Sequence, residues 1–548
     1  MRPTKEQFDQ ARDLHAGRVE AYRRGELSDG EFRPVRLSYG LYYQLDHTSY
    51  MQRIKLPGGM MTADQMDALA GVFDDYGRGI THVTTRADVQ IHWVPLEKVA
   101  EMYQRLEAVG ITTRGACADS VRNVTACPFA GTSPHEPFDV TPYVQAIHDA
   151  FLFSPLNLTL PRKFKIGVEG CPLDCAQASI NDIGLYAARR DGRDGFSVWA
   201  GGGLGAAPFL AVRVSEFVPA EDVLAWCEAI VRVHHRAGER KNRHKARLKF
   251  VARRLGEAGF RELVEAEVSR VMAERGEDLR AEVRDAVAAH RVPPPAAAPV
   301  RSAARPGFAA WAATNAAPQA DPAFAAVTVT LPLGDVDSDQ FRAIARLARQ
   351  LGNGTVRATN EQNLVLPWVR RESLETLHAA LVELRLAEGE ASLLSDVVSC
   401  PGLDYCSLAV TRSMGVGERI RTHLAESRFD STALGPFHVK ISGCPNSCGQ
   451  HHVGDVGLTG SMLKDEAGID RPHYSVLVGG SVGEGRSRVG KRLHGRFSED
   501  DTPRVVAAVA AHFGRSRSPG ESFAEFVQRT GTDGLDDVAR AAARDEVR

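Results

Sequence analysis

The sequence predicts an α+β protein with an internal duplication, in which two similar halves are related by pseudo-two-fold symmetry. A strand–helix–strand–helix order occurs twice, once from Arg53 and again between Val327 and Ala387. Cysteine positions then repeat at a constant separation in the segments that follow. A Pro- and Ala-rich stretch at residues 291–323 separates the halves, as expected for a linker. Each half is therefore expected to hold a small α/β half-domain followed by a larger α/β domain.

Length and composition limit the class of protein. A chain of 548 residues is too long for a single core. Its 67 basic and 69 acidic residues nearly balance, which argues against nucleic acid as a partner. No apolar run is long enough to span a membrane, and the first residues lack the apolar core of a signal peptide. Nine cysteines, an odd number set in short pairs, are typical of metal ligation in a reducing compartment. We expect a cytoplasmic protein without a membrane partner.

The small half-domains follow from hydrophobic periodicity. After an N-terminal arm at residues 1–52, residues 53–116 contain RIKLPGG as a strand, TADQMDALAGVFDDYG as an amphipathic helix, THVTTRADVQIHWVP as a strand pair and LEKVAEMYQRLEAVG as a second helix. Residues 324–388 repeat this order with VTVTLPLG, DSDQFRAIARLARQLG, GTVRATNEQNLVLPWV and RESLETLHAALVELRLA. Even the separation of Pro57 from Gln65 recurs, between Pro332 and Gln340.

The larger domains, residues 117–290 and 389–548, share their cysteines. A shift of 273 positions carries Cys127 onto Cys400, Cys171 onto Cys444 and Cys175 onto Cys448. The remaining second-half cysteine, Cys406, falls on Ser133, so the first half keeps three of four thiols. Three thiolates hold a cubane poorly, which predicts a degenerate first-half site. Three interpretations stay open for it: inert packing, a covalent link between a tyrosine and one of these cysteines or Cys117, and completion of the ligand set by Cys117.

The four second-half cysteines form a C-x5-C pair in SCPGLDYC and a C-x3-C pair in SGCPNSCG. Two short pairs brought together by the fold can supply the four thiolates of an iron–sulfur cluster. Zinc sites usually have two to four residues between paired ligands, so the longer spacing favours iron. Glycines beside the cysteines let the backbone pass close to a cofactor and leave N–H groups for sulfide. We expect Cys400, Cys406, Cys444 and Cys448 to bind a [4Fe-4S] cluster, with buried core cysteines as the alternative.

These pairs resemble the sirohaem-dependent nitrite and sulfite reductase family, over most of residues 45–490. The residues TTR-x3-Q at Arg86, Arg-Asn-Val at Arg122 and LPRKFK around Lys163 occur in the family order. The resemblance implies two ferredoxin-like α/β half-domains and two sirohaem/[4Fe-4S]-type α/β domains. It also implies a sirohaem, whose iron Cys448 would bridge to the cluster.

The resemblance assigns side chains to the substrate and the cofactor. Lys163 and Lys165 alternate along a predicted strand, so both project from one face toward either water or an anion. Lysine can give up a proton whereas guanidinium stays charged, which makes the lysines the general-acid candidates. The resemblance places four residues over the substrate: Arg86, Arg122, Lys163 and Lys165. It implies four residues at the cofactor: Arg162, Asn360, Gln362 and Cys448.

The implied activity is reduction of sulfite to sulfide by six electrons from ferredoxin. No flavin or nicotinamide fingerprint is visible, because GGGLG at 201–205 recurs as GGSVG at 479–483 and belongs to the repeat. Sulfite-type family members tend to carry K-x-K and nitrite-type members tend to have Asn at the second lysine, so Lys165 favours sulfite. The alternatives are nitrite reduction to ammonia, a precorrin-3B synthase-like oxygenase and a non-catalytic iron–sulfur redox protein.

A basic segment at residues 236–254 has three interpretations. It is the solvated face of a helix, or a dock for an acidic electron carrier, since positive charge speeds the encounter with a negative partner. The third interpretation, a nucleic-acid contact, is disfavoured by the near-neutral charge of the chain.

Overall fold

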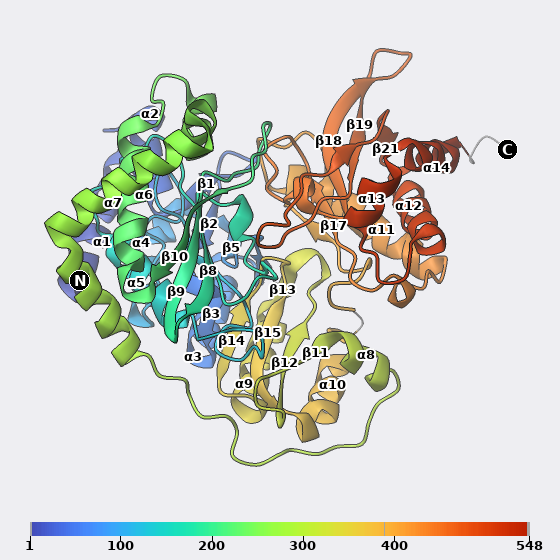
Figure 1. Cartoon of the computed structure of the whole chain (residues 1–548), viewed down its shortest axis with the longest axis horizontal. Helices are drawn as coiled ribbons and strands as arrows, with labels where there is room; N and C mark the ends of the chain where they lie inside the picture. Colours follow the sequence, from blue (N-terminus) through green and yellow to red (C-terminus); the bar gives the residue numbers. More distant parts are fainter. Residues whose placement is uncertain (1–2, 388–389, 545–548) are drawn as a thin grey trace.

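The computed structural model describes residues 3–387 and 390–544, so the domain boundary expected at 388–389 lies outside the described residues. Within the described part the chain forms four β-sheets with helices packed around them (Figure 1). Two of the sheets belong to the half-domains and two to the larger domains. This architecture confirms the predicted α+β class and its internal duplication.

Each half-domain sheet takes an edge strand from the other half. The first sheet has the order β1-β2-β5-β4-β13, and the second has the order β11-β12-β15-β14-β3. Strand β13 of the second half pairs with β4, and β3 of the first half pairs with β14. The exchange joins the half-domains into one unit. The strands are β1 Leu41–Tyr43, β2 Tyr50–Ile54, β3 Met60–Thr62, β4 Ile80–Val83, β5 Val89–Val94, β11 Ala316–Pro318, β12 Phe324–Val329, β13 Asp335–Asp337, β14 Thr355–Ala358 and β15 Leu364–Arg370.

The first helix of each half-domain begins at the same kind of sequence signal and occupies the equivalent position. Helices α3 (Ala63–Tyr76) and α9 (Ser338–Leu351) both begin at a capping box, formed by Thr62 with Gln65 and by Asp337 with Gln340. The two helices pack against each other, and one apolar core spans both half-domains. The other helices here are α1 Lys5–Arg23, α2 Asp29–Ser38, α4 Val99–Ala108, α8 Phe308–Asn315 and α10 Leu374–Glu383.

The larger domains each contain a mixed sheet, with orders β10-β9-β8-β7-β6 and β16-β17-β18-β19-β20, and β21 also pairs with β19. The strands that precede the cysteine pairs obey the shift of 273 positions, for example β7 (Ile166–Glu169) and β17 (Val439–Ser442). The remaining strands are β6 Thr125–Ala126, β8 Ile183–Arg190, β9 Arg193–Ala200, β10 Val212–Pro219, β16 Val398–Ser399, β18 Val456–Lys464, β19 Asp470–Val478, β20 Lys491–Arg492 and β21 Phe497–Ser498.

Parallel pairing positions the cysteines. Strands β6 and β7 are parallel, as are β16 and β17. The carboxyl ends of parallel strands lie at the same edge of a sheet. Cys400 directly follows β16 and Cys444 follows β17 after one glycine, so the two cysteine pairs start from neighbouring strand ends. The same holds for Cys127 and Cys171 in the first half.

The larger domains have separate cores and different helices. Helices α5 (Thr141–Leu152), α6 (Val223–Ala237) and α7 (Leu248–Ala289) belong to the first core, and α7 is interrupted at Gly256. The second core takes α11 Ser413–Glu426, α12 Thr502–Ser516, α13 Phe523–Thr530 and α14 Asp533–Arg544. The chain between α7 and α8 runs along the outside of the molecule, and α8 and β11 lie within the predicted linker (Figure 1).

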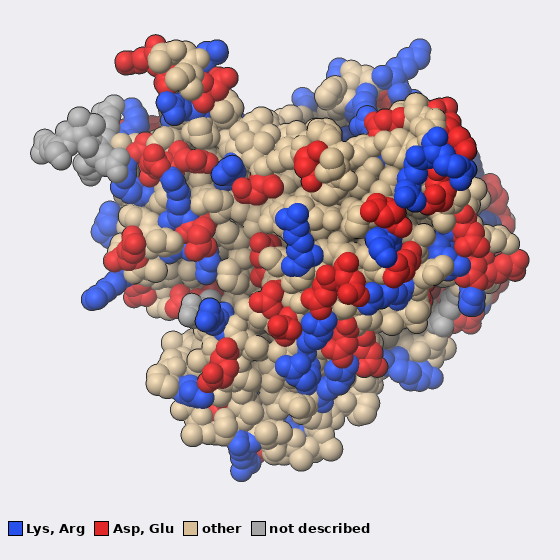
Figure 2. All heavy atoms as spheres, turned by 180° about the vertical axis from the view of Figure 1, so that it is seen from behind, with Lys and Arg blue, Asp and Glu red and all other residues tan. Residues whose placement is uncertain are grey.

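The surface fits the balanced composition. Basic and acidic side chains are interspersed on the face drawn in Figure 2. Among the described helices, none combines the length and the apolar character needed to cross a bilayer.

Candidate functional site

The second-half cysteines sit in a cradle of close backbone contacts. The backbone N–H of Gly443 donates to Sγ of Cys400 over 3.2 Å, and the backbone N–H of Cys406 donates to the carbonyl of Gly402 over 2.8 Å. A Cβ at Gly443 would lie 2.7 Å from the carbonyl oxygen of Thr411, so only glycine fits there. N–H groups aimed at sulfur stabilise thiolate and sulfide charge, which is what a bound cluster requires.

Two of the four predicted ligands, Cys400 and Cys444, follow neighbouring parallel strands, and ligation by all four cysteines stays a prediction. Burial raises the pKa of Cys400, Cys406 and Cys444, and the charge of Cys448 raises each of them further. Cys400 and Cys444 are buried, whereas Cys448 is exposed and its backbone carbonyl accepts a hydrogen bond from Thr85 of the first half. In the described part of the chain no His, Cys, Asp or Glu group is arranged to hold a single metal ion. Four thiolates that each bind a different iron of a cubane do not need to converge on one point.

The cationic side chains of Lys163, Lys165, Arg86 and Arg122 lie near Cys448 and are called the positive face below. Phe164 is fully buried and points into the first core, so Lys163 and Lys165 on either side of it project the other way and stay half-buried. The negative charge of Cys448 favours the charged form of both ammonium groups, against the effect of burial on their pKa. Neither donates a hydrogen bond to a protein group among the described residues. Burial lowers the pKa of Lys163 to about 8. Burial, with the charges of Arg86, Lys163 and Arg247, lowers that of Lys165 well below its usual value.

The two predicted arginines flank the lysines and are held by the protein. Arg86 is buried and donates to Oδ1 of Asn181 over 2.8 Å and to the carbonyl of Asn123. Burial lowers its pKa to about 10. Arg122 is half-buried and donates to the carbonyls of Ala116 and Ala118 over 3.2 and 2.7 Å. Nε of both arginines is buried without a hydrogen-bond partner, which suits a site that receives an anionic group.

Two cations in this face were missed at the sequence level. Burial acts to lower the pKa of Arg53. The negative charges of Asp88, Cys117, Tyr42 and Cys448 outweigh burial, so the pKa is raised. Lys55 is buried, and burial together with Arg122 lowers its pKa to about 7. The sequence did contain a signal for them. Arg53 and Lys55 in RIK, at the end of β2, alternate by two positions as Lys163 and Lys165 do.

The turn that carries Arg86 also touches the cysteine loop. Thr85 donates from Oγ1 to the carbonyl of Cys448 over 2.8 Å, and Gln450 donates from Nε2 to the carbonyl of Thr85 over 3.2 Å. These two bonds fix the first-half turn against the second-half thiol. Cys117, for which a tyrosine link was considered, lies against Tyr42, whose pKa burial raises to about 12.

The predicted cofactor residues are spread more widely. Arg162 is half-buried beside the lysine pair and reaches Asp119 over 3.4 Å. Asn360 instead donates to the carbonyl of Ala176, next to the first-half cysteines. The amide of Gln362 donates to His82 and Val83 and accepts from Ser399. Cofactor binding by Asn360 and Gln362 stays a prediction, and the structure places both among protein groups.

Asp182 fixes the backbone of the lysine pair. Its buried carboxylate accepts the backbone N–H of Lys165 over 2.8 Å and the guanidinium of Arg247 over 2.7 Å. In the second half Asp455 makes the same contact with the backbone N–H of His438, over 2.8 Å. The duplicated aspartate therefore fixes the backbone in both halves, and the residue that it holds is lysine in the first half and histidine in the second.

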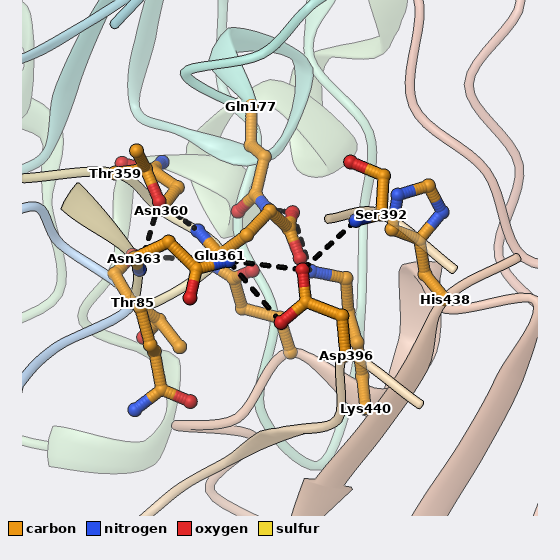
Figure 3. Close-up of polar contacts among 12 residues, drawn as sticks. Thr85, Gln177, Thr359, Asn360, Glu361, Asn363, Ser392, Asp396, His438 and Lys440 are labelled. Atoms are coloured by element: carbon orange, nitrogen blue, oxygen red, sulfur yellow. Dashed lines mark hydrogen bonds and ion pairs between the residues drawn. The ribbon is translucent and has the colours of Figure 1, made fainter. Parts of the chain in front are cut away.

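The counterpart of the positive face carries a different set of charges (Figure 3). Glu361 stands where Arg86 stands in the first half, since Gln362 and Ala87 after them share a positive φ. Lys440 is buried and donates to both oxygens of Glu361 over 2.7 and 2.6 Å, and Gln177 of the first half adds a bond of 2.9 Å. Burial raises the pKa of the neighbouring Asp396 to about 6. An internal ion pair fills this location, so the positive face occurs once.

Replacing Lys440 with Met is expected to destabilise the protein by about 3 kcal/mol, because it leaves the Glu361 carboxylate without its cation. The midpoint of thermal unfolding should fall by several degrees. Arg349→Met is the matched control, since Arg349 pairs with Asp64 and Asp67 at the surface and its loss should cost at most about 1 kcal/mol. Equal shifts in the two variants would contradict the structural weight given to the buried pair.

Comparison with known proteins agrees with this geometry. Residues 117–272 and 390–544 match the "Nitrite and sulphite reductase 4Fe-4S domain", and residues 42–109 and 317–384 match the "Nitrite/Sulfite reductase ferredoxin-like half domain". The chain is 33% identical over 469 residues to the chloroplastic ferredoxin–nitrite reductase of Zea mays, covering 82% of this chain and 76% of that protein. It is 29% identical over 497 residues to sulfite reductase [ferredoxin] 2 of Mycolicibacterium paratuberculosis, covering 90% and 84%.

A solved structure gives the same result. The NirA protein of Mycobacterium tuberculosis superposes with a TM-score of 0.78 at 26% identity, covering 96% of this chain and 97% of that one. The predicted half-domain and cluster-domain types are confirmed. The predicted cofactors, a [4Fe-4S] cluster and a sirohaem, are confirmed as well, and the cysteine cradle and the unpaired arginine nitrogens fit them. The chain therefore belongs to the ferredoxin-dependent nitrite and sulfite reductases, oxidoreductases that take electrons from ferredoxin and act on small oxyanions.

Proposed function

We propose that the protein reduces sulfite to sulfide, with six electrons and six protons consumed and three waters released. The observation that carries this proposal is the pair Lys163 and Lys165, which face Cys448 and are not hydrogen-bonded to described protein groups. When bound, the sirohaem supplies the iron that holds the anion and delivers electrons to it. The lysines and Arg122 stabilise the charge of the anion, as fixed donors do in other oxyanion sites.

Proton supply falls to the lysines. Removing oxygen as water needs a proton donor within reach of each oxygen, and a lysine whose pKa is lowered toward neutrality gives up its proton readily. Lys163, with a pKa of about 8, is mostly charged at neutral pH. Burial also lowers the pKa of Lys55 to about 7 and that of Lys165 well below its usual value. The face therefore contains both fixed charge and exchangeable protons.

Nitrite reduction to ammonia is the second candidate. It is supported by the names of several relatives, including the ferredoxin–nitrite reductases of Zea mays and Synechococcus elongatus. Lys165 supports sulfite instead, because nitrite-type members of the family tend to have Asn at the second lysine of K-x-K. A cytoplasmic location is part of the proposal, since free thiols persist in a reducing compartment.

The deciding experiment measures turnover of both anions by one holoenzyme preparation, with reduced viologen as donor. A higher kcat/KM for sulfite supports the proposal, and a large preference for nitrite overturns it. Lys165→Asn should lower the ratio of sulfite to nitrite kcat/KM, with Lys98→Asn on the surface as the control.

The KM for sulfite is expected to rise as pH increases above about 8. Lys163 is charged below its pKa of about 8 and neutral above it, so its attraction for the anion is lost in that direction. The measurement is KM against pH between 6.5 and 9.5 for the wild type and for Lys163→Arg. The arginine stays charged, so its KM should not rise above pH 8, and a parallel rise above pH 8 in both proteins would assign the effect to another group.

A further inference from the structure

The sulfur of Cys400 lies beside two hydrogen-bonding groups of the second half. One is the backbone N–H of Gly443, and the other is the side-chain hydroxyl of Ser413, whose Oγ is 3.3 Å from Sγ of Cys400. Ser413 is the first residue of α11 and is fully buried, so its hydroxyl has to find its partners within the protein. A hydroxyl at this distance from a predicted cluster ligand can change the electron density on the sulfur.

The place of this hydroxyl is fixed by its neighbours. A Cβ at Gly402 would collide with Oγ of Ser413, so glycine at that position leaves the space that the hydroxyl occupies. The same Oγ lies 2.8 Å from the carbonyl oxygen of Cys400. The single proton of Ser413 therefore has two acceptors on one residue, the carbonyl oxygen and the sulfur of Cys400.

The carbonyl of Cys400 has a second donor, which is the hydroxyl of Ser399, over 3.0 Å. Ser399 is fully buried, and its backbone N–H donates to Oε1 of Gln362 over 2.7 Å. The amide nitrogen of Gln362 is in turn held by two hydrogen bonds to the first half. The carbonyl therefore keeps a hydrogen bond from a fixed donor when the proton of Ser413 turns away from it.

The charge of the sulfur decides where the proton of Ser413 goes. A free thiol can donate to Oγ while the hydroxyl donates to the carbonyl. A thiolate ligand has no proton and is negatively charged, so Oγ at 3.3 Å would present only lone pairs to it unless the O–H turns toward the sulfur. A hydrogen bond to a charged acceptor is also roughly twice as strong as one between neutral groups. Ligation by Cys400 therefore favours donation from Ser413 to the sulfur.

We propose that the Ser413 hydroxyl donates a hydrogen bond to the Cys400 thiolate in the holoenzyme and thereby raises the reduction potential of the [4Fe-4S] cluster. A donor to a ligand sulfur withdraws negative charge from it and stabilises the reduced cluster, which carries one more electron. A higher potential favours electron transfer from ferredoxin to the cluster. The proposal rests on cluster ligation by Cys400 and does not depend on the choice between sulfite and nitrite.

The test is a redox titration of the substrate-free holoenzyme, with the reduced cluster detected by electron paramagnetic resonance. Ser413→Ala is expected to retain its iron and sulfide and to have a lower cluster midpoint potential than the wild type. Ser373→Ala is the matched control, because Ser373 is a buried serine of the second half-domain whose hydroxyl accepts the backbone N–H of Val300 over 3.0 Å. Its cluster potential should equal that of the wild type.

A second pair of variants separates the hydroxyl from the shape of the side chain. Ser413→Thr and Ser413→Val introduce side chains of nearly equal volume, and only threonine has a hydroxyl. The threonine variant should have the higher cluster potential of the two. This comparison decides the question if Ser413→Ala does not retain its cluster.

Resonance Raman spectroscopy reports on the hydrogen bond itself. Donation to the Cys400 sulfur weakens its bond to iron, so the iron–cysteine stretching frequency should rise in Ser413→Ala and stay unchanged in Ser373→Ala. Transfer into D2O should shift this band in the wild type, and the shift should be smaller in Ser413→Ala, where only the Gly443 N–H remains as a donor.

Two outcomes overturn the proposal. One is an equal cluster potential and an equal iron–cysteine frequency in the wild type and Ser413→Ala at full iron content, which would leave the hydroxyl on the carbonyl of Cys400. The other is an equal shift of the cluster and sirohaem potentials, since a single bond to Cys400 should act on the cluster more strongly. Because no substrate is present, a preference of the enzyme for nitrite would leave these results unaffected.

Discussion

Cys444→Ser is expected to abolish sulfite and nitrite turnover and to remove the cluster absorbance. Cys444 follows β17, and Cys400 follows the neighbouring parallel strand β16; the charge of Cys448 raises the pKa of the Cys444 thiol. A serine hydroxyl does not provide the thiolate that iron prefers, so the cubane loses one of four ligands. Because Cys448 lies in the same loop and faces the cationic side chains, sirohaem binding should weaken together with the cluster. Iron and acid-labile sulfide content, with the visible spectrum, measure the loss.

The duplication supplies a matched control. Cys171 occupies the equivalent position after β7 and is buried. Burial raises the pKa of its thiol, as it does for Cys444. Cys171→Ser should retain the cluster, the haem spectrum and most of the activity. If it loses iron to the same extent as Cys444→Ser, the assignment of the cluster to the second half is wrong.

Lys165→Met is expected to lower kcat for sulfite by roughly 10²- to 10⁴-fold, the range for loss of a general acid. Methionine keeps the length of the side chain and removes its proton and charge. The backbone should stay in place, because Asp182 holds the N–H of Lys165 and the side chain makes no hydrogen bond to described protein groups. The cofactor spectrum should therefore be unchanged. Single-turnover kinetics with pre-reduced enzyme separate the chemical step from electron delivery by the donor.

Lys165→Arg separates charge from proton supply. Arginine keeps the positive charge but does not deprotonate, so KM should stay near the wild-type value while kcat falls. If Lys165→Met lowers sulfite turnover less than threefold, proton supply must come from another group, and Lys55, buried with a pKa of about 7, is the next candidate.

The sequence predicted the duplication because the spacing from Cys127 to Cys175 repeats without insertion from Cys400 to Cys448. The bounds of β7 and β17 obey that shift to the residue. It did not predict the exchange of β3 and β13, which are three residues long and carry too little pattern to show their partners. Edge pairing of this kind depends on tertiary packing.

Some cations of the site could be predicted from the sequence and others could not, and the difference has a physical reason. Lys163 and Lys165 alternate about a buried Phe164, so their shared direction could be read from the sequence. Arg53 and Lys55 show the same alternation, but only the fold shows that β2 ends beside Cys448. Asn360 lies in a repeat of the turn that carries Arg86, yet in that copy Glu361 pairs with Lys440 and the side chains meet protein groups.

The central claim is that the second half holds the cluster while the first half lines the anion chamber. Anomalous diffraction at the iron edge, from a crystal of the holoenzyme, tests it most directly. Iron is expected among the sulfurs of residues 400, 406, 444 and 448, with a further iron on the side of Cys448 where Lys163 and Lys165 lie. Iron located instead among Cys127, Cys171 and Cys175 would contradict it.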